Sequence, residues 1–194
     1  MYNVTFDLSD MHRFGGAFYD FLRLRKHFFV DTLGWDIPHN DKVEMDQYDN
    51  PLAHYSVVLR EGKVIGGART MPTTASWGLH SYMLRDAAEG KLPDIPPQVL
   101  RHSVQSSSIW ACTRLVIADE VNTHADRSQC LSLIVEGLAS VARRNGVGIL
   151  GIELWLLGGL AKMDRDPVTP GAEFRVAAAG PLVTARWSGI GHRP

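Results

Sequence analysis

Aromatic, cationic and anionic side chains are concentrated in one short stretch of this chain. Arg25, Phe29 and Trp35 come first, and the aspartates Asp46 and Asp49 follow them. A sulfonium-bearing amino acid needs this mixture of groups. Aromatic faces within about 6 Å stabilise its cation, carboxylates hold its amine, and the forked donors of arginine clamp its carboxylate. The stretch is therefore a candidate binding site for such a compound.

Two further arginines, Arg69 and Arg114, lie at the ends of expected strands, where each could clamp a carboxylate. Each could instead form a structural ion pair with Asp46 or Asp49. The two roles are compatible, because a network of ion pairs can hold the loop that forms a binding site. The aspartates could also cap their own loop by accepting hydrogen bonds from backbone amides. For Trp35 the alternative is a core residue at the end of a helix.

The composition is that of a globular protein that meets charged partners only through local patches. The chain has 194 residues, 45% apolar and 21% charged, with a net charge of −1. These values fit a single domain over residues 1–194, and they give no overall field that favours nucleic acid or an anionic membrane. The N-terminus lacks the pattern of a secretory signal, and no apolar run reaches the roughly 20 residues of a membrane span. We therefore expect a cytoplasmic protein.

Hydrophobic periodicity and turn residues predict an α/β fold. Strands are expected at 2–8, 53–59, 63–71, 108–117, 149–157, 174–178 and 182–187. Helices are expected at 11–33, 83–88, 127–144 and 160–164. Residues 35–52 are expected to form an ordered loop. This order predicts a mixed sheet with helices packed on it, in which residues 108–157 form a right-handed parallel crossover.

Four ordered motifs resemble those of the acyl-homoserine lactone synthases, the LuxI-like autoinducer synthases. The motifs are Arg25, Phe29 and Trp35; Asp46-Gln47-Tyr48-Asp49-Asn50; Gly66-Gly67-Ala68-Arg69; and Trp110-Ala111-Cys112-Thr113-Arg114. The segment Tyr82-Met83-Leu84 is also similar to the family, and the likeness covers roughly residues 20 to 165. It implies a GNAT-like mixed β-sheet flanked by α-helices, in a single three-layer domain.

The resemblance also implies a reaction between S-adenosylmethionine and an acyl group carried as a thioester on acyl carrier protein or coenzyme A. The amine is acylated, the homoserine lactone ring closes and methylthioadenosine leaves, for bacterial quorum sensing. S-adenosylmethionine is then a substrate, and neither a cofactor nor a metal is expected. The residues implied in binding it are Arg25, Phe29, Trp35 and Asp46. The positions implied in catalysis are Asp46, Asp49, Arg69, Arg114 and Ala111.

Ala111 stands where the family has a glutamate, which is the candidate base for acylation or the group that holds the amine. Alanine has no titratable group, and a placed base is typically worth 10²–10⁴-fold in rate. The chain could be an active synthase that uses another base, such as Asp46 through a water. It could be a variant of low turnover that still binds its substrates, or a relative diverted to another acyl transfer or to binding. We expect substrate binding to be retained.

The acyl chain would need an apolar tunnel beside strands 108–117 and 149–157. The candidate residues are Leu100, Ile109, Leu115, Ile149, Ile152 and Trp155, although each could be an ordinary core residue. An acidic carrier protein would need a basic patch. The candidates are Arg143, Arg144, Lys162 and Arg165. The pair Arg143-Arg144 could instead simply complement the dipole at the end of its helix.

Two other functions compete with lactone synthesis. A GNAT-type N-acyltransferase that acylates another amine should carry a Q/R-x-x-G-x-G/A loop before its helix, and residues 120–128 contain no glycine. The other alternative is a catalytically weak homologue that binds S-adenosylmethionine and acyl thioesters. The sequence leaves open the acyl chain length, the oxidation of its 3-position, the choice of carrier and the oligomeric state.

Overall fold

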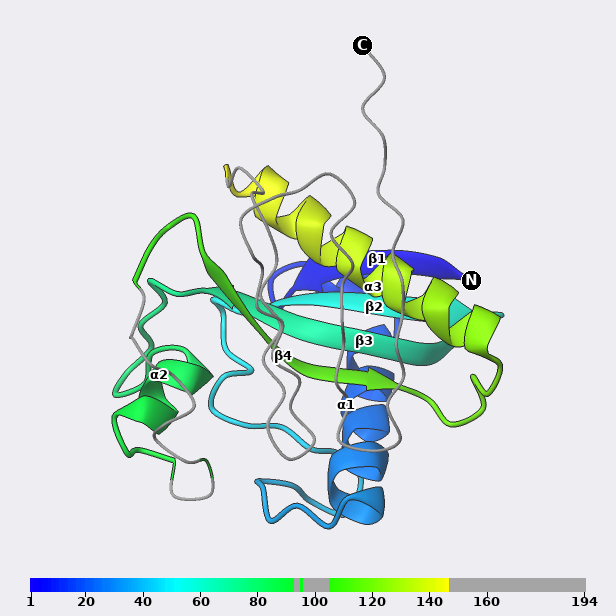
Figure 1. Cartoon of the computed structure of the whole chain (residues 1–194), viewed down its shortest axis with the longest axis horizontal. Coiled ribbons are helices and arrows are strands. Elements are labelled where there is room, and N and C mark those ends of the chain that lie inside the picture. Colours follow the sequence, from blue (N-terminus) through cyan, green and yellow to red (C-terminus); the bar gives the residue numbers. More distant parts are fainter. Residues whose placement is uncertain (93–94, 96–104, 147–194) are drawn as a thin grey trace. The chain divides into compact units, whose positions relative to one another are not determined.

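A four-stranded antiparallel sheet is the centre of the fold. The computed structural model describes residues 1–92, 95 and 105–146, all within the unit Met1–Ile149. The strands are β1 (Tyr2–Asp7), β2 (His54–Arg60), β3 (Lys63–Pro72) and β4 (Trp110–Ile117). They lie in the order β1-β2-β3-β4, each antiparallel to its neighbour (Figure 1). The expected parallel strand at 149–157 falls outside the described residues, so the mixed character of the sheet stays a prediction.

A two-residue hairpin turn joins β2 to β3, as the sequence predicts. Arg60 pairs with Lys63, and the two residues between them, Glu61 and Gly62, have φ values of 53° and 79°. Positive φ at both central positions gives a turn whose twist matches that of the flanking strands. The hairpin starts the pairing of β3, and a bulge at Ile65 then shifts it by one residue, so that Arg69 pairs with Tyr55.

The helical region expected over residues 11–33 is broken into three pieces, which corrects that prediction. They are a 3-10 helix (Met11–Phe14), α1 (Ala17–Arg25) and a π-helix (Lys26–Thr32). The first break occurs at Gly15, whose φ of 59° does not continue a right-handed helix. The π-helix ends with the Trp35 amide donating to the Phe29 carbonyl at 2.9 Å. This bond brings Trp35 back over the helix end.

Helices cover both faces of the sheet. On β3, a Cβ at Gly66 would lie 2.8 Å from Cys130 Sγ of α3 (His124–Arg144), whereas one at Gly67 would lie 2.8 Å from Phe21 of α1. Adjacent residues of a strand point to opposite faces, so α1 and α3 lie on opposite sides of the sheet (Figure 1). The α/β fold with three layers is therefore confirmed for this unit.

The longest helix, α3, begins three residues before its expected start because Thr123 caps it. The Thr123 hydroxyl accepts a hydrogen bond from the Asp126 amide at 3.1 Å. Gly137 allows close approach to the sheet, since a Cβ there would be 2.2 Å from Ser56 Oγ. The Ser56 hydroxyl donates to the Ile134 carbonyl at 2.8 Å, which ties the helix to β2.

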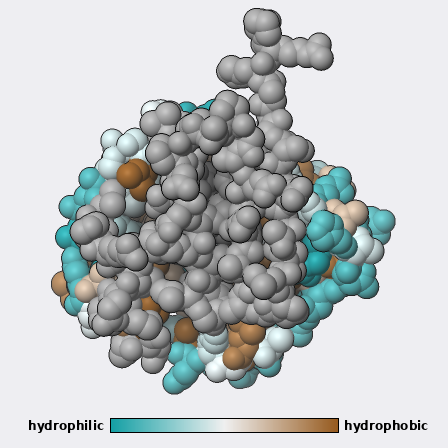
Figure 2. Space-filling view, viewed as in Figure 1, coloured by the Kyte–Doolittle hydropathy of each residue, from teal (hydrophilic) through white to brown (hydrophobic). Residues whose placement is uncertain are grey.

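A short helix, α2 (Met83–Ala88), interrupts the long connection between β3 and β4, as the sequence predicts. Within the described residues, no helix is long and apolar enough to cross a bilayer. On the face shown in Figure 2, hydrophobic residues form small separate groups among hydrophilic ones at the rim of the described surface. Scattered exposure of this kind is usual for a globular protein.

Candidate functional site

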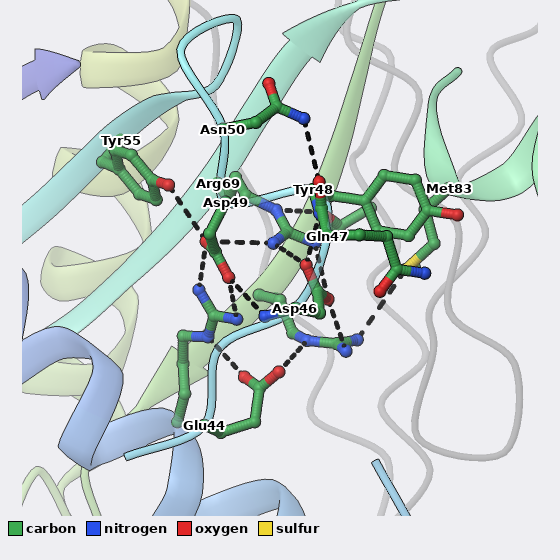
Figure 3. A network of polar contacts seen from close by, with 12 residues as sticks. Glu44, Asp46, Gln47, Tyr48, Asp49, Asn50, Tyr55, Arg69 and Met83 are labelled. Carbon is green, nitrogen blue, oxygen red and sulfur yellow. Dashed lines mark hydrogen bonds and ion pairs between the residues drawn. The ribbon is translucent and has the colours of Figure 1, made fainter. Parts of the chain in front are cut away.

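Three arginines and three carboxylates form a closed ring of ion pairs beside the sheet (Figure 3). We call this group the charge ring. Its members, in order around the ring, are Arg25, Glu44, Arg114, Asp46, Arg69 and Asp49. Each arginine bridges two carboxylates and each carboxylate bridges two arginines. The three positive and three negative formal charges therefore balance.

Arg25 closes the ring at the end of α1. Its Nε donates to Glu44 at 2.6 Å, and its two terminal nitrogens donate to the two Asp49 oxygens at 2.8 and 2.9 Å. The side chains of all three residues are 0% exposed. Such a forked pair fixes both partners in position as well as stabilising them. Arg25 therefore attaches α1 to the loop that follows it.

Arg69 joins the loop to β3. Its terminal nitrogens donate to the two Asp46 oxygens at 2.5 and 3.1 Å, and one of them also lies 3.0 Å from Asp49. Its Nε donates to Thr113 Oγ1 of β4 at 3.2 Å. The Tyr48 ring lies over the guanidinium, with 5.6 Å between the ring centroid and Cζ. Each donor group of Arg69 thus has a protein partner.

Arg114 reaches the ring because β4 bulges at that point. The pairing shifts between Gly67 opposite Val116 and Arg69 opposite Thr113, so β4 has one residue more than β3 here. Arg114 itself has a φ of 57°, a left-handed conformation that costs a non-glycine residue roughly 1–2 kcal/mol. Bulges commonly redirect a side chain beside a functional site.

The redirected Arg114 side chain links the ring to two other parts of the site. Its Nε donates to Glu44 at 3.2 Å and its Nη2 to Asp46 at 2.8 Å. Its Nη1 lies 3.8 Å from Met83 Sδ on α2, and its Cζ lies 5.5 Å from the centroid of the Phe29 ring. Arg114 therefore contacts the charge ring, α2 and the aromatic side chains at once.

The loop of the second motif caps itself, as one of the sequence alternatives predicts. Asp46 Oδ1 accepts from the Tyr48 amide, and Asp49 Oδ2 accepts from the Asp46 amide, both at 2.9 Å. Asn50 Oδ1 accepts from the Leu52 amide at 3.0 Å. These are the local bonds that aspartate and asparagine form in turns. The loop is thus held both by its own backbone and by the charge ring.

The electrostatics of the ring favour its charged state. Burial alone would raise the pKa of Asp46, but the charges of Arg69 and Arg114 outweigh it and lower that pKa below its ordinary value. The pKa of Asp49 is lowered in the same way, against the effect of burial, by Arg69 and Arg25. Carboxylates with lowered pKa values and several donors each are weak proton acceptors at neutral pH. Asp46 is thus a poor candidate for the general base.

Two aromatic side chains, Phe29 and Trp35, stack on each other beside the charge ring. Phe29 is buried and Trp35 is half-buried, with 5.0 Å between their ring centroids and an interplanar angle of 28°. Since Arg114 packs against Phe29, a continuous series of contacts joins Trp35 to Arg25 through the charge ring. The predicted aromatic and ionic residues are thus brought together in one cluster.

Ala111 lies on the same face of the sheet as the charge ring. It pairs with Met71 on β3, and it is two residues from Thr113, which accepts a hydrogen bond from Arg69. Alternate residues of a strand share a face. A longer side chain at Ala111 would therefore extend toward the ring. The neighbouring Cys112 is buried, and burial raises the pKa of its thiol to about 12, so it is protonated and unreactive at neutral pH.

The structure adds residues that the sequence analysis did not assign to the site. Glu44 completes the ring, Tyr55 donates to Asp49 at 3.0 Å, and Tyr48 donates to Asp86 of α2 at 2.9 Å. Glu44 and Tyr48 carried a sequence signal, because Glu44 lies two residues before the second motif and Tyr48 lies within it. The partners of the two tyrosines depend on how strand, loop and helix pack. Among the described residues, no group of three His, Cys, Asp or Glu side chains is arranged to hold a metal ion.

The residues predicted for the thioester side are only partly described. Ile109 is exposed just before β4, and Leu115 is half-buried on it. Arg143 and Arg144 are exposed at the end of α3, and Arg144 donates to Thr5 Oγ1 at 2.7 Å. The other candidates, Leu100, Ile149, Ile152, Trp155, Lys162 and Arg165, lie outside the described residues. The roles of both groups stay predictions.

Comparison with known proteins decides the family. The family model for autoinducer synthases matches residues 11–148. The acyl-homoserine-lactone synthase of Acinetobacter nosocomialis is 30% identical over 183 residues, which is 87% of this chain and 86% of that protein. The chain belongs to the autoinducer synthase family. The Pseudomonas aeruginosa acyl-homoserine-lactone synthase is also 30% identical, over 95 residues, 47% of this chain and 41% of that protein.

Solved structures give the same fold. A CoA-dependent acyl-homoserine lactone synthase, BjaI, is similar with a TM-score of 0.55 and 19% identity, over 74% of this chain and 61% of that one. TofI is similar with a TM-score of 0.52 and 22% identity, over 76% and 68%. The GNAT-like fold that the motifs imply is therefore confirmed. The matches to BjaI and to the Pseudomonas synthase each span less than two thirds of those proteins.

Proposed function

We propose that this chain is an acyl-homoserine lactone synthase that joins S-adenosylmethionine to an acyl thioester. The observation that carries the proposal is the joining of all four motifs in one cluster, in a chain of the autoinducer synthase family. Two acyl-homoserine-lactone synthases align with this chain over 86% and 41% of their own lengths. The structure of BjaI has been determined with SAM and isopentyl-CoA, which supports the same two substrates here.

The reaction has two bond-forming steps. The neutral amine of S-adenosylmethionine attacks the thioester carbonyl, and the thiol of the carrier leaves with the proton that the amine loses. A carboxylate oxygen then attacks the γ-carbon, the C–S bond breaks, and methylthioadenosine leaves with the electron pair. Because a sulfonium is already a good leaving group, the second step needs mainly proximity.

The charge ring acts in this proposal as a frame. Its arginines and carboxylates satisfy one another, so binding the substrate through them would first break buried ion pairs. The half-buried Trp35 is free of that cost. Its indole, supported by Phe29 at 5.0 Å, offers an aromatic face to the sulfonium, worth roughly 0.5–2 kcal/mol.

Ala111 favours a second candidate, a homologue that binds both substrates with little turnover. The described part of the site has a neutral charge ring and no carboxylate at this position. In this candidate S-adenosylmethionine still binds, whereas its amine is acylated only slowly. Ala111→Glu separates the two candidates, because it restores the missing group in the weak homologue.

The acyl group can reach the site on either of two carriers. We propose acyl-CoA as one donor, following BjaI, and acyl carrier protein as the other, docked on the exposed arginines at the end of α3. The cytoplasm, where both carriers occur, stays the predicted location.

The proposal is tested by product analysis. The purified chain is incubated with S-adenosylmethionine and a panel of acyl-CoA and acyl carrier protein thioesters, and lactone and methylthioadenosine are measured by mass spectrometry. We expect an acyl-homoserine lactone from at least one donor. Binding of S-adenosylmethionine by calorimetry without any lactone, from any donor, would support the binding homologue instead.

A further inference from the structure

A buried carboxylate outside the charge ring joins two loops at the site. Asp86 of α2 is 0% exposed. It accepts hydrogen bonds from the Tyr48 hydroxyl at 2.9 Å, the Ser81 hydroxyl at 2.6 Å and the Ser81 amide at 3.1 Å. His80 Nδ1 lies 3.1 Å away and Lys91 Nζ 3.3 Å away. These partners come from both sides of α2 and from the loop of the second motif.

One face of α2 meets the charge ring twice. Met83 and Asp86 are three residues apart, so they share a face of the helix. Met83 Sδ lies 3.8 Å from Arg114, and Asp86 accepts from Tyr48, whose ring lies over Arg69. In the view of Figure 3, Tyr48 and Met83 both lie at the right of the network. The helix therefore contacts two of the three ring arginines, directly or through one side chain.

We propose that Asp86 is a positioning residue of the synthase site, which holds residues 80–91 against the charge ring through Tyr48. The proposal rests on the proposed function, since it assigns α2 a place in that site. A helix of six residues has almost no stability of its own, so its position depends on such contacts. Burial would raise the pKa of Asp86, but the hydrogen bonds from Ser81, Tyr48 and Lys91 lower it. The carboxylate is thus ionised at neutral pH and accepts strongly.

This role predicts a specific kinetic effect. If residues 80–91 separate from the ring for part of the time, only the remaining fraction of molecules can bind substrate. The apparent dissociation constant then rises by the inverse of that fraction, whereas molecules that do bind react at the normal rate. Loss of the Asp86 bonds should therefore raise KM for S-adenosylmethionine and leave kcat nearly unchanged.

The test uses Asp86→Asn, Tyr48→Phe and the double variant in the full chain, with Glu89→Gln as control. Glu89 lies just after α2, and its exposed carboxylate pairs with Arg85 and Lys91. In hydrogen exchange without ligand, we expect amides of residues 80–91 to exchange at least tenfold faster in Asp86→Asn. Amides of α3 and all amides of the control should keep their wild-type rates.

In steady-state assays we expect KM for S-adenosylmethionine to rise at least fivefold in Asp86→Asn, with kcat within twofold of wild type. The double variant should be no worse than Asp86→Asn, because both changes break the same link. Unchanged exchange, or faster exchange with an unchanged KM, would overturn the proposal. If the wild-type chain forms no lactone, the proposed function fails, and the exchange rates still decide whether Asp86 holds the segment.

Discussion

Ala111→Glu is the substitution that most sharply probes the chemistry of the site. Ala111 lies on the face of β4 that meets the charge ring, opposite Met71 and two residues from Thr113. The ring is neutral as it stands, whereas S-adenosylmethionine carries one net positive charge from its carboxylate, ammonium and sulfonium groups. A glutamate would make this face net negative, and it would also supply a proton acceptor that the position now lacks.

The size of the effect follows from charge and distance. Opposite charges about 5 Å apart attract by roughly 3 kcal/mol at an effective dielectric constant of 20. Desolvation of the new carboxylate offsets part of this attraction, and a net gain of about 1.4 kcal/mol is already tenfold in rate. A well-placed base alone is worth 10²–10⁴-fold. We therefore expect kcat/KM for S-adenosylmethionine to rise at least tenfold in Ala111→Glu.

The assay measures lactone formation at saturating acyl-CoA, with Ala111→Gln as the matched control. Glutamine has nearly the same size and no titratable group, so we expect it to change kcat/KM by less than threefold. Thermal melting of both variants checks that the charge ring stays intact. Equal rates for the wild type and the glutamate variant, or for glutamate and glutamine, would refute the reasoning.

Three further predictions concern the frame and the aromatic stack. Because the folded-state pKa values of Asp46 and Asp49 are lowered, their stabilisation is full above their unfolded pKa of about 3.9. It is lost as the pH falls through the lower folded values, so the melting temperature should be steady from pH 7 to 5 and drop below about pH 4. Gly137→Ala places a Cβ 2.2 Å from a β2 hydroxyl and should destabilise the chain by about 1–3 kcal/mol in urea unfolding, whereas an unchanged midpoint would contradict the packing. Trp35→Ala should weaken S-adenosylmethionine binding by roughly 2- to 30-fold in calorimetry, the equivalent of 0.5–2 kcal/mol, while the half-exposed Trp77 changed to alanine serves as control and should leave affinity unchanged.

Local signals allowed much of the fold to be predicted. The turn between β2 and β3, the helix α3 and the short α2 each depend on residues close together in the sequence, and the structure confirms them. The breaks in the first helical region were missed. Its aromatic residues repeat at helical spacing across Gly15. Periodicity alone does not distinguish a continuous α-helix from a helix whose hydrogen bonding becomes π-helical after Arg25.

The site was predicted as a set of residues but without its connections. The four motifs contain five of the six charge-ring members, because their residue types suit both ion pairs and substrate contacts. The partners of Arg114 depend on the bulge that turns its side chain toward Glu44 and Asp46. The link from Tyr48 to Asp86 spans 38 residues, and it carries no sequence pattern. The partners of Arg114 and the link from Tyr48 to Asp86 both depend on how the strands, the loop and α2 pack together.

The ratio of products tests the central claim most directly. Equal amounts of methylthioadenosine and acyl-homoserine lactone should appear when the wild-type chain receives S-adenosylmethionine and an accepted acyl thioester, and neither should appear when one substrate is omitted. Methylthioadenosine released without lactone, or no product above the level of enzyme-free controls with any thioester, would contradict the assignment of this chain as a lactone synthase.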